Sequence, residues 1–216
     1  VPVEEADIYL AVREVAHARL FRHARWLRLH LISAIRDFAH GISIDSDAIM
    51  NLQEGFDPTD TQALQELFGS GALLPEHTED QKRALARLET MLALIEGWVD
   101  HVTGLATHRL PKADSLAETI RRRRASGGPA ERAFQTLVGL ELRPRRLRES
   151  SALWASLTTQ LGAEARDALW QHPDSLPTEA DFDNPEAFLH RLAHPADTRD
   201  DMDNALRDLL DEGSPE

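Results

Sequence analysis

Apolar residues recur at helical spacing through much of this 216-residue chain. The clearest run has intervals of three and four: Leu85, Leu88, Leu92, Ile95, Val99 and Val102. Such intervals place side chains on one face of a helix. The segment just before it has Thr78 and Gln81 at the spacing of a capping box, which marks the start of a helix. We therefore predict a helix of about 30 residues that begins after Thr78 and ends at Pro111.

Two more helices are predicted near the start, over residues 4–22 and 25–40, because residues 4–39 contain neither proline nor glycine. In the first, a single stripe is expected to be partly buried, formed by Leu10, Glu14, His17 and Phe21. In the second, the expected apolar stripe comprises Trp26, Leu29, Ile32, Ile35 and Ala39.

Turn and cap signals divide the rest of the chain into shorter helices. Those after the long helix are expected to begin near Ser115, Pro129 and Pro144, and a last core helix, with caps at Thr178 and Pro185, is expected to end near His194. Short helices are expected over 45–53, 61–68, 163–170 and 200–210. Alternating runs of β-branched residues, which favour strands, do not occur in the sequence. The predicted fold is all-α, an irregular multi-helix bundle.

The charge is unevenly distributed. The whole chain carries −13, and residues 174–216 hold 13 acidic and 3 basic residues, a balance of −10. We predict a single helical domain over residues 1–195, followed by an acidic tail over 196–216. An acidic chain of this kind is not expected to bind nucleic acid.

Several classes of site and location are excluded by composition. Cysteine is absent, so any metal must be bound by His, Asp or Glu. No apolar run approaches the roughly 18 residues of a membrane span, and no signal peptide is visible. We expect a cytoplasmic protein without a membrane partner. Because the chain opens on Val1 and Pro2 without an initiating Met, we expect it to be a piece of a longer protein.

The first candidate site is the sequence Arg13-Glu14-Val15-Ala16-His17. It differs by one residue from His-Glu-x-x-His, in which two histidines bind zinc and the glutamate acts on the metal-bound water. Here Arg13 stands at the position of the first histidine. The alternative is that Glu14 and His17 pair with each other or with a nearby arginine, because buried polar groups need partners.

The second candidate site lies on the long helix. Glu96 and Asp100 are four residues apart, so they share a face and repel each other by about 0.2–0.5 kcal/mol unless a cation lies beside them. That cation is a metal ion or an arginine. Gly97, between them, costs a helix about 1 kcal/mol relative to alanine. We therefore expect another segment to approach closely at Gly97, and we expect it to be the first helix.

A third feature is the run of four arginines at residues 121–124. Four consecutive residues of a helix point in all directions, so some are expected to face inward and to require acids. We predict that at least two of them bond carboxylates within the fold, and we expect the arginines of this region to hold Glu96, Asp100, Glu131 and Glu141 in a network of ion pairs. A phosphate or nucleic-acid surface is the alternative, although it lacks interleaved aromatic residues.

Residues 9–21, 94–100, 121–131 and 137–146 resemble an uncharacterised, mainly actinobacterial family whose members are labelled zinc-dependent metalloproteases or hydrolases of zincin-like type. The resemblance covers about residues 3–188. A related branch is associated with deazaflavin coenzyme biosynthesis and carries the complete His-Glu-x-x-His motif. The family is longer at its N-terminus, so this chain is similar to its C-terminal half.

The resemblance implies a zincin-like helical core and a role for each candidate residue. Glu14 is the implied general base, His17 and Glu96 are implied zinc ligands, and Asp100 supports or completes the metal site. Arg13 departs from the family pattern, because it brings a positive charge to the position of the first metal-binding histidine. We expect it to pair with Glu96, Asp100 or Glu14, and we expect little bound zinc.

Two classes of function therefore remain open. In the first, the chain is a metal-dependent hydrolase of the metallopeptidase type, which acts on a peptide or protein and is inactive if Arg13 prevents metal binding. In the second, it is a non-catalytic structural or interaction protein in which Arg13 and the arginine run replace the metal. Zinc is the expected cofactor of the first class alone.

Overall fold

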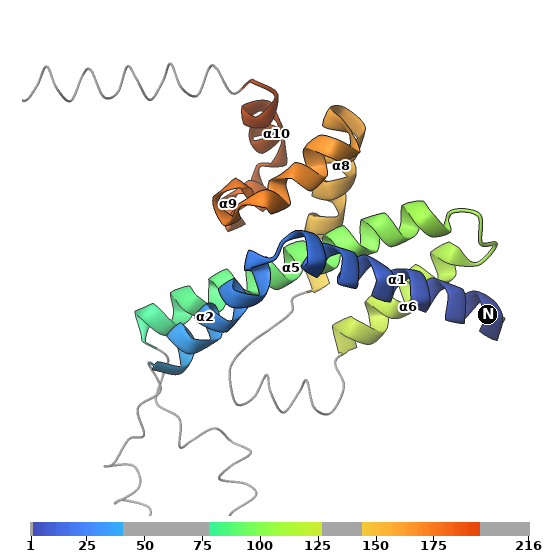
Figure 1. Cartoon of the computed structure of the whole chain (residues 1–216), viewed down its shortest axis with the longest axis horizontal. Helices are drawn as coiled ribbons and strands as arrows, with labels where there is room; N and C mark the ends of the chain where they lie inside the picture. Colours follow the sequence, from blue (N-terminus) through green and yellow to red (C-terminus); the bar gives the residue numbers. More distant parts are fainter. Residues whose placement is uncertain (1, 41–77, 127–143, 195–216) are drawn as a thin grey trace, which may run out of the picture. The chain divides into compact units, whose positions relative to one another are not determined.

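The structure is a computed structural model that describes residues 2–40, 78–126 and 144–194. Every regular element within these ranges is helical, and none is a strand, which confirms the all-α prediction (Figure 1). The seven α-helices of these ranges are α1 (Val3–His23), α2 (Trp26–His40), α5 (Glu79–Thr107), α6 (Ala113–Ser126), α8 (Pro144–Ala168), α9 (Glu179–Asp183) and α10 (Pro185–Ala193). Two short 3-10 helices follow α8, Leu169–Gln171 and Pro173–Ser175.

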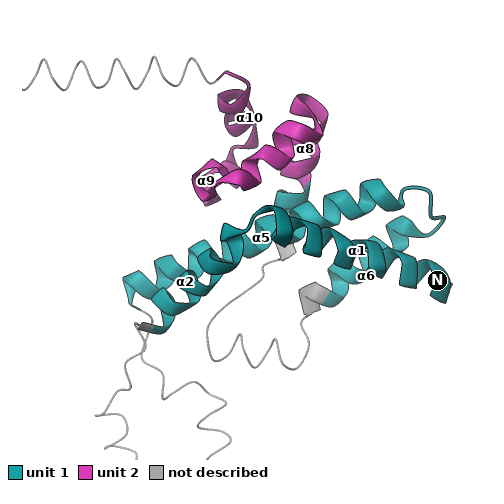
Figure 2. Ribbon diagram, viewed as in Figure 1, with its two compact units in different colours: residues 1–151 teal, residues 152–216 magenta. Residues whose placement is uncertain are grey.

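The chain divides into two compact units, residues 1–151 and 152–216 (Figure 2). The helices predicted over 45–53, 61–68 and 200–210, and the one expected from Pro129, lie outside the described residues. The division into a domain over 1–195 and an acidic tail over 196–216 stays a prediction, because residues 195–216 are also outside them.

In the first unit, α2 lies along the first part of the long helix α5, and α1 crosses α5 and also contacts α6 (Figure 1). The predicted capping box starts α5, since Gln81 N donates to Thr78 Oγ1 at 3.2 Å and Thr78 N donates to Gln81 Oε1 at 2.9 Å. The buried Gln81 side chain also donates to the carbonyl of Phe38 in α2 at 3.4 Å. With about 1.5 Å per residue, α5 extends roughly 44 Å, long enough to support both shorter helices.

The face that α1 buries differs from the predicted one. Its buried residues are Tyr9, Arg13, Ala16 and Leu20, whereas Leu10 and Glu14 are exposed. The expected stripe was therefore wrong for Leu10 and Glu14, whereas His17 and Phe21 are partly buried, and the buried face is rotated by one residue from the expected one. Because α1 has apolar residues on several faces, its periodicity does not determine which face meets α5.

The helix predicted over residues 25–40 is confirmed as α2, but the residues that give its period are not the ones it buries. Leu27 and Phe38 are buried, while Leu29, Ile32 and Ile35 are exposed. The apolar residues of α2 surround most of the helix, so the side that packs against α5 determines which of them are buried. The exposed stripe remains as an apolar surface on the first unit.

Gly97 marks a close approach, as predicted, but the approaching segment is α8. A Cβ at Gly97 would lie 2.3 Å from Ser150 Oγ and 2.8 Å from the backbone nitrogen of Ser151. The expectation that the first helix fills this place was wrong in that respect. Instead, α1 reaches α5 at the preceding residue, Glu96, through Arg13.

The second unit has its own packing. Trp154 and Trp170 stack with ring centroids 5.5 Å apart, and α8 bends at Gly162, whose φ of 86° favours glycine. The predicted cap at Thr178 is present. The Asp181 carboxylate accepts a hydrogen bond from the backbone nitrogen of Thr178 at 2.7 Å and one from the Thr178 hydroxyl at 2.8 Å. Burial raises the pKa of Asp181, but these bonds and one from Arg191 outweigh it and hold that pKa below its usual value.

Candidate functional site

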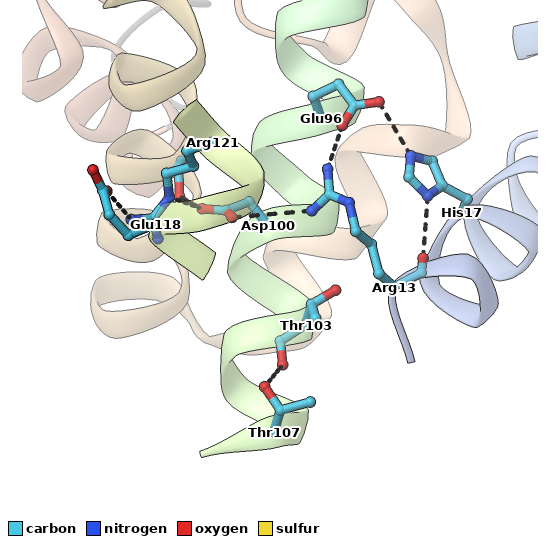
Figure 3. Close-up of polar contacts among 9 residues, drawn as sticks. Arg13, His17, Glu96, Asp100, Thr103, Thr107, Glu118 and Arg121 are labelled. Atoms are coloured by element: carbon cyan, nitrogen blue, oxygen red, sulfur yellow. Dashed lines mark hydrogen bonds and ion pairs between the residues drawn. The ribbon is translucent and has the colours of Figure 1, made fainter. Parts of the chain in front are cut away.

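A buried arginine lies between two carboxylates where α1 meets α5 (Figure 3). Arg13 Nη2 donates to Glu96 Oε2 at 2.5 Å, and Arg13 Nη1 lies 4.0 Å from Asp100 Oδ1. The side chains of Arg13, Glu96 and Asp100 are 5%, 14% and 11% exposed. This confirms the prediction that Arg13 pairs with these acids, and it identifies arginine as the cation beside Glu96 and Asp100.

His17 lies one turn after Arg13 and contacts the same cluster. Its Nε2 is 3.2 Å from Glu96 Oε1, and its Nδ1 is 3.1 Å from the carbonyl oxygen of Arg13 (Figure 3). Both neighbouring oxygens are acceptors, so which ring nitrogen donates depends on the tautomer of His17. In this orientation Nε2 is directed at Glu96 Oε1.

Asp100 joins the cluster to α6 and to the beginning of α8. Its Oδ2 accepts from Ser151 Oγ at 3.0 Å and from Arg121 Nε at 3.2 Å. Its carboxylate therefore has two donors besides the nearby Arg13. These contacts make the carboxylate less available to another cation.

The arginine run forms ion pairs, as predicted. Arg121 pairs with Asp100 and lies 3.6 Å from Glu118, and Arg122 Nε donates to Glu118 at 2.7 Å. The hydrogen bond from Arg122 lowers the pKa of Glu118 below its usual value, against the opposing effect of desolvation.

The side chains of residues 121–123 are exposed and that of Arg124 lies outside the described side chains, so the expectation that some of the run faces inward stays a prediction. A long arginine side chain reaches a partly buried carboxylate while its stem stays at the surface. The other expected partners, Glu131 and Glu141, lie outside the described residues.

Glu14, the implied general base, is exposed on α1. Arg13 takes the buried position beside it and turns Glu14 out of the stripe that faces α5. The structure thus brings His17, Glu96 and Asp100 together around Arg13 and leaves Glu14 outside this group. Its catalytic role stays a prediction.

Sequence reasoning missed the buried hydroxyl groups of this region. Tyr9 and Thr103 are fully buried, and their hydroxyls, like Arg13 Nε and Nη1, have no hydrogen-bond partner among the described residues. Burial and the Asp100 carboxylate raise the pKa of Tyr9 above its usual 10.0, although Arg13 opposes them. The sequence signal for Tyr9 was its spacing of four from Arg13, which places both on one helix face.

A zinc ion does not fit this arrangement. Catalytic zinc sites have three protein ligands with free lone pairs and one water. Here both carboxylates are engaged by Arg13, and His17 Nε2 is directed at Glu96. The described ranges contain no group of three or more His, Asp or Glu that could hold a metal ion. The metal-binding roles of His17, Glu96 and Asp100 stay a prediction.

A comparison with protein families places these features in context. Residues 1–189 match the profile of the zincin-like metallopeptidase family, whereas no curated protein and no solved structure matches the chain. Among the helices described, none combines the length and apolar character needed to cross a bilayer. The actinobacterial and deazaflavin-associated resemblances stay predictions. Because the family profile matches residues 1–189 of the 216, the chain belongs to the zincin-like metallopeptidase family.

Proposed function

We propose that this chain is a non-catalytic member of its family, in which the Arg13 guanidinium takes the place of a metal ion. In this role Arg13 is the cation that joins α1 to the carboxylates of α5. The observation that carries the proposal is the 2.5 Å contact between Arg13 Nη2 and Glu96 Oε2, formed by side chains that are 5% and 14% exposed.

The charges around Arg13 support this proposal. A divalent ion about 4 Å from a guanidinium is repelled by roughly 8 kcal/mol at an effective dielectric of about 20. The carboxylates that would offset this repulsion already pair with Arg13 and, at Asp100, with Arg121. Zinc binding therefore requires Arg13 to leave its acids.

The arrangement of the other two motif residues points the same way. A zincin-type hydrolase needs a histidine lone pair on the metal and a glutamate on the metal-bound water. His17 Nε2 is turned to Glu96, and Glu14 is exposed. The chain retains the helical framework of the family and uses its polar residues for contacts between helices.

Metal-dependent hydrolysis of a peptide is the second candidate function. The observation in its favour is the family match over residues 1–189, together with the position of His17, Glu96 and Asp100 on two facing helices. In that case Arg13 would have to move away when the metal binds, and a peptide or protein would be the substrate.

Zinc binding to the full chain separates the two candidates. We expect substoichiometric zinc in protein purified without added metal. Arg13→His should bind zinc at least about a thousandfold more tightly in calorimetric titration, because the repulsion of roughly 8 kcal/mol between the divalent ion and the guanidinium is removed. Arg109→His, on the exposed turn after α5, is the matched control and should not change the affinity.

The opposite result has a clear form. Stoichiometric zinc in the unmodified protein, lost in His17→Ala, would refute the non-catalytic proposal. Peptidase activity that disappears in Glu14→Gln would then establish the hydrolase.

A further inference from the structure

One surface of the first unit carries exposed apolar residues along its length. The helices α1 and α2 turn their buried residues toward α5 and α6, and the residues on the opposite side form what we call the outer face. Its large apolar side chains are between 46% and 71% exposed: Ile8 and Val15 on α1, and Leu29, Ile32 and Ile35 on α2. Apolar residues gathered on one face mark an interaction surface.

The charges of the outer face are separated along its length. The α1 half carries the exposed acids Glu4, Asp7 and Glu14, and no basic side chain of residues 3–18 is exposed. The second half, residues 19–36, contains five exposed arginines and no acid: Arg19, Arg22, Arg25, Arg28 and Arg36. None of these acids and arginines forms an ion pair within the described ranges.

We propose that the outer face is the interface of a two-fold symmetric dimer, in which α1 and α2 of two copies run antiparallel. A two-fold interface pairs each residue with a different residue of the other copy, and the reverse pair occurs as well. An axis near residue 20 places Glu4 beside the partner's Arg36, Ile8 beside the partner's Ile32, and Glu14 near the partner's Arg25. Each acidic half then faces a basic half, and apolar residues meet along the seam.

The order of the charges selects a second copy over other occupants. An anionic membrane or a nucleic acid would attract the arginines but repel Glu4, Asp7 and Glu14 along the same face. A partner that fits must carry both signs in the reverse order, and an antiparallel copy of this chain does so. The inference is independent of the function proposed for the Arg13 cluster.

The size of the outer face limits the strength of the dimer. From residue 3 to residue 36 the helices extend about 50 Å, with a contact width of about 10 Å. The dimer would thus bury about 1,000 Å² in total, the lower limit of specific interfaces. We expect a reversible dimer that dissociates at micromolar concentration and weakens with salt, since exposed charges are screened.

Charge reversal tests the pairing. Sedimentation velocity on the full chain should show a dimer that forms with rising concentration. Arg25→Glu with Arg36→Glu places acids opposite the partner's Glu14 and Glu4, and Glu4→Arg with Glu14→Arg places arginines opposite the partner's Arg36 and Arg25. Each double variant alone should raise the dissociation constant at least tenfold through like-charge repulsion, and a one-to-one mixture should restore dimers. Circular dichroism checks that each variant is folded.

A second charge change serves as the control. Arg109→Glu with Lys112→Glu alters the net charge equally but lies outside the outer face, so it should leave the dimer intact. An unmodified chain that stays monomeric at all concentrations would overturn the proposal, as would a mixture of the reversed variants that fails to associate. Binding of the monomer to phosphatidylserine vesicles, without dimerisation, would overturn it in favour of a membrane.

Discussion

Replacing Gly97 with alanine inserts a methyl group where α8 passes α5. The new Cβ would lie 2.3 Å from Ser150 Oγ, 2.6 Å from Ser150 Cβ and 2.8 Å from the backbone nitrogen of Ser151. Rotation of the Ser150 side chain moves Oγ away but leaves the other two contacts in place. The substitution therefore requires a shift of the backbone of α5 or α8.

Two terms of opposite sign set the magnitude. Overpacking of this kind costs about 1–3 kcal/mol, and alanine in place of glycine stabilises a helix by about 0.8–1.0 kcal/mol. Since backbone atoms must move, we expect Gly97→Ala to lower the free energy of unfolding by about 1–2 kcal/mol overall.

Gly104 supplies the matched control, because it lies on the same helix and a Cβ there has nothing within 4 Å. Gly104→Ala should stabilise the protein by up to about 1 kcal/mol through helix propensity alone. The difference between the two variants, about 1–3 kcal/mol, isolates the contact with α8.

Urea unfolding, followed by tryptophan fluorescence and by circular dichroism, measures both variants. Adding Ser150→Gly to Gly97→Ala removes two of the three short contacts, so the double variant should recover at least about 0.5 kcal/mol relative to additivity. If Gly97→Ala is as stable as Gly104→Ala, the close approach of α8 does not exist in solution and this reasoning fails.

Two further predictions concern the Arg13 cluster. Tyr9 is the only tyrosine, so ultraviolet titration of tyrosinate reports it alone; its midpoint should lie above 10.0 in the folded protein and return to about 10 in urea. Because the pKa of Tyr9 is raised on folding, its contribution to stability is complete below pH 10 and is lost as the pH rises toward the folded pKa. A midpoint at or below 10.0 in the folded protein would contradict the argument that burial raises this pKa. Arg13→Met should lower the free energy of unfolding by about 3 kcal/mol, because it leaves Glu96 and Asp100 without their shared cation. The double variant Arg13→Met with Glu96→Gln should lose less than the sum of the single variants, and additive losses would show that the pair does not stabilise the fold.

Local signals were sufficient for the helices and their ends. The capping boxes at Thr78 and Thr178 are present because their bonds form within one turn and depend on neighbouring residues alone. The separate helix predicted from residue 163 corresponds to the second part of α8, because Gly162 has a non-helical backbone with φ of 86° and ψ of 168° and so divides α8 at a kink. The ion pair between Asp100 and Arg121 was also predicted from the sequence, because a charged side chain near a core needs an opposite charge.

The candidate site was only partly predictable. Its members Arg13, His17, Glu96 and Asp100 were identified from the degenerate motif and from the spacing of the acids on α5. The motif also suggested that Glu14 faces the site, but Glu14 is exposed. The predicted and observed buried faces of α1 differ by a rotation of one residue. Apolar residues lie on both faces, so the sequence is compatible with either one being buried.

Only the tertiary structure decided which face of each helix is buried and which segment meets Gly97. The buried side of α1 includes Arg13 because Glu96 and Asp100, more than 80 residues away in the chain, compensate its charge. The outer face of α2 keeps Leu29 and Ile35 exposed because α5 packs against the other side. Periodicity within a helix depends on neighbours a few residues apart, whereas burial depends on distant segments that bring matching shape and charge. For that reason the sequence by itself determined where the helices lie, and the packing of α5 against α1, α2 and α8 determined what the site contains.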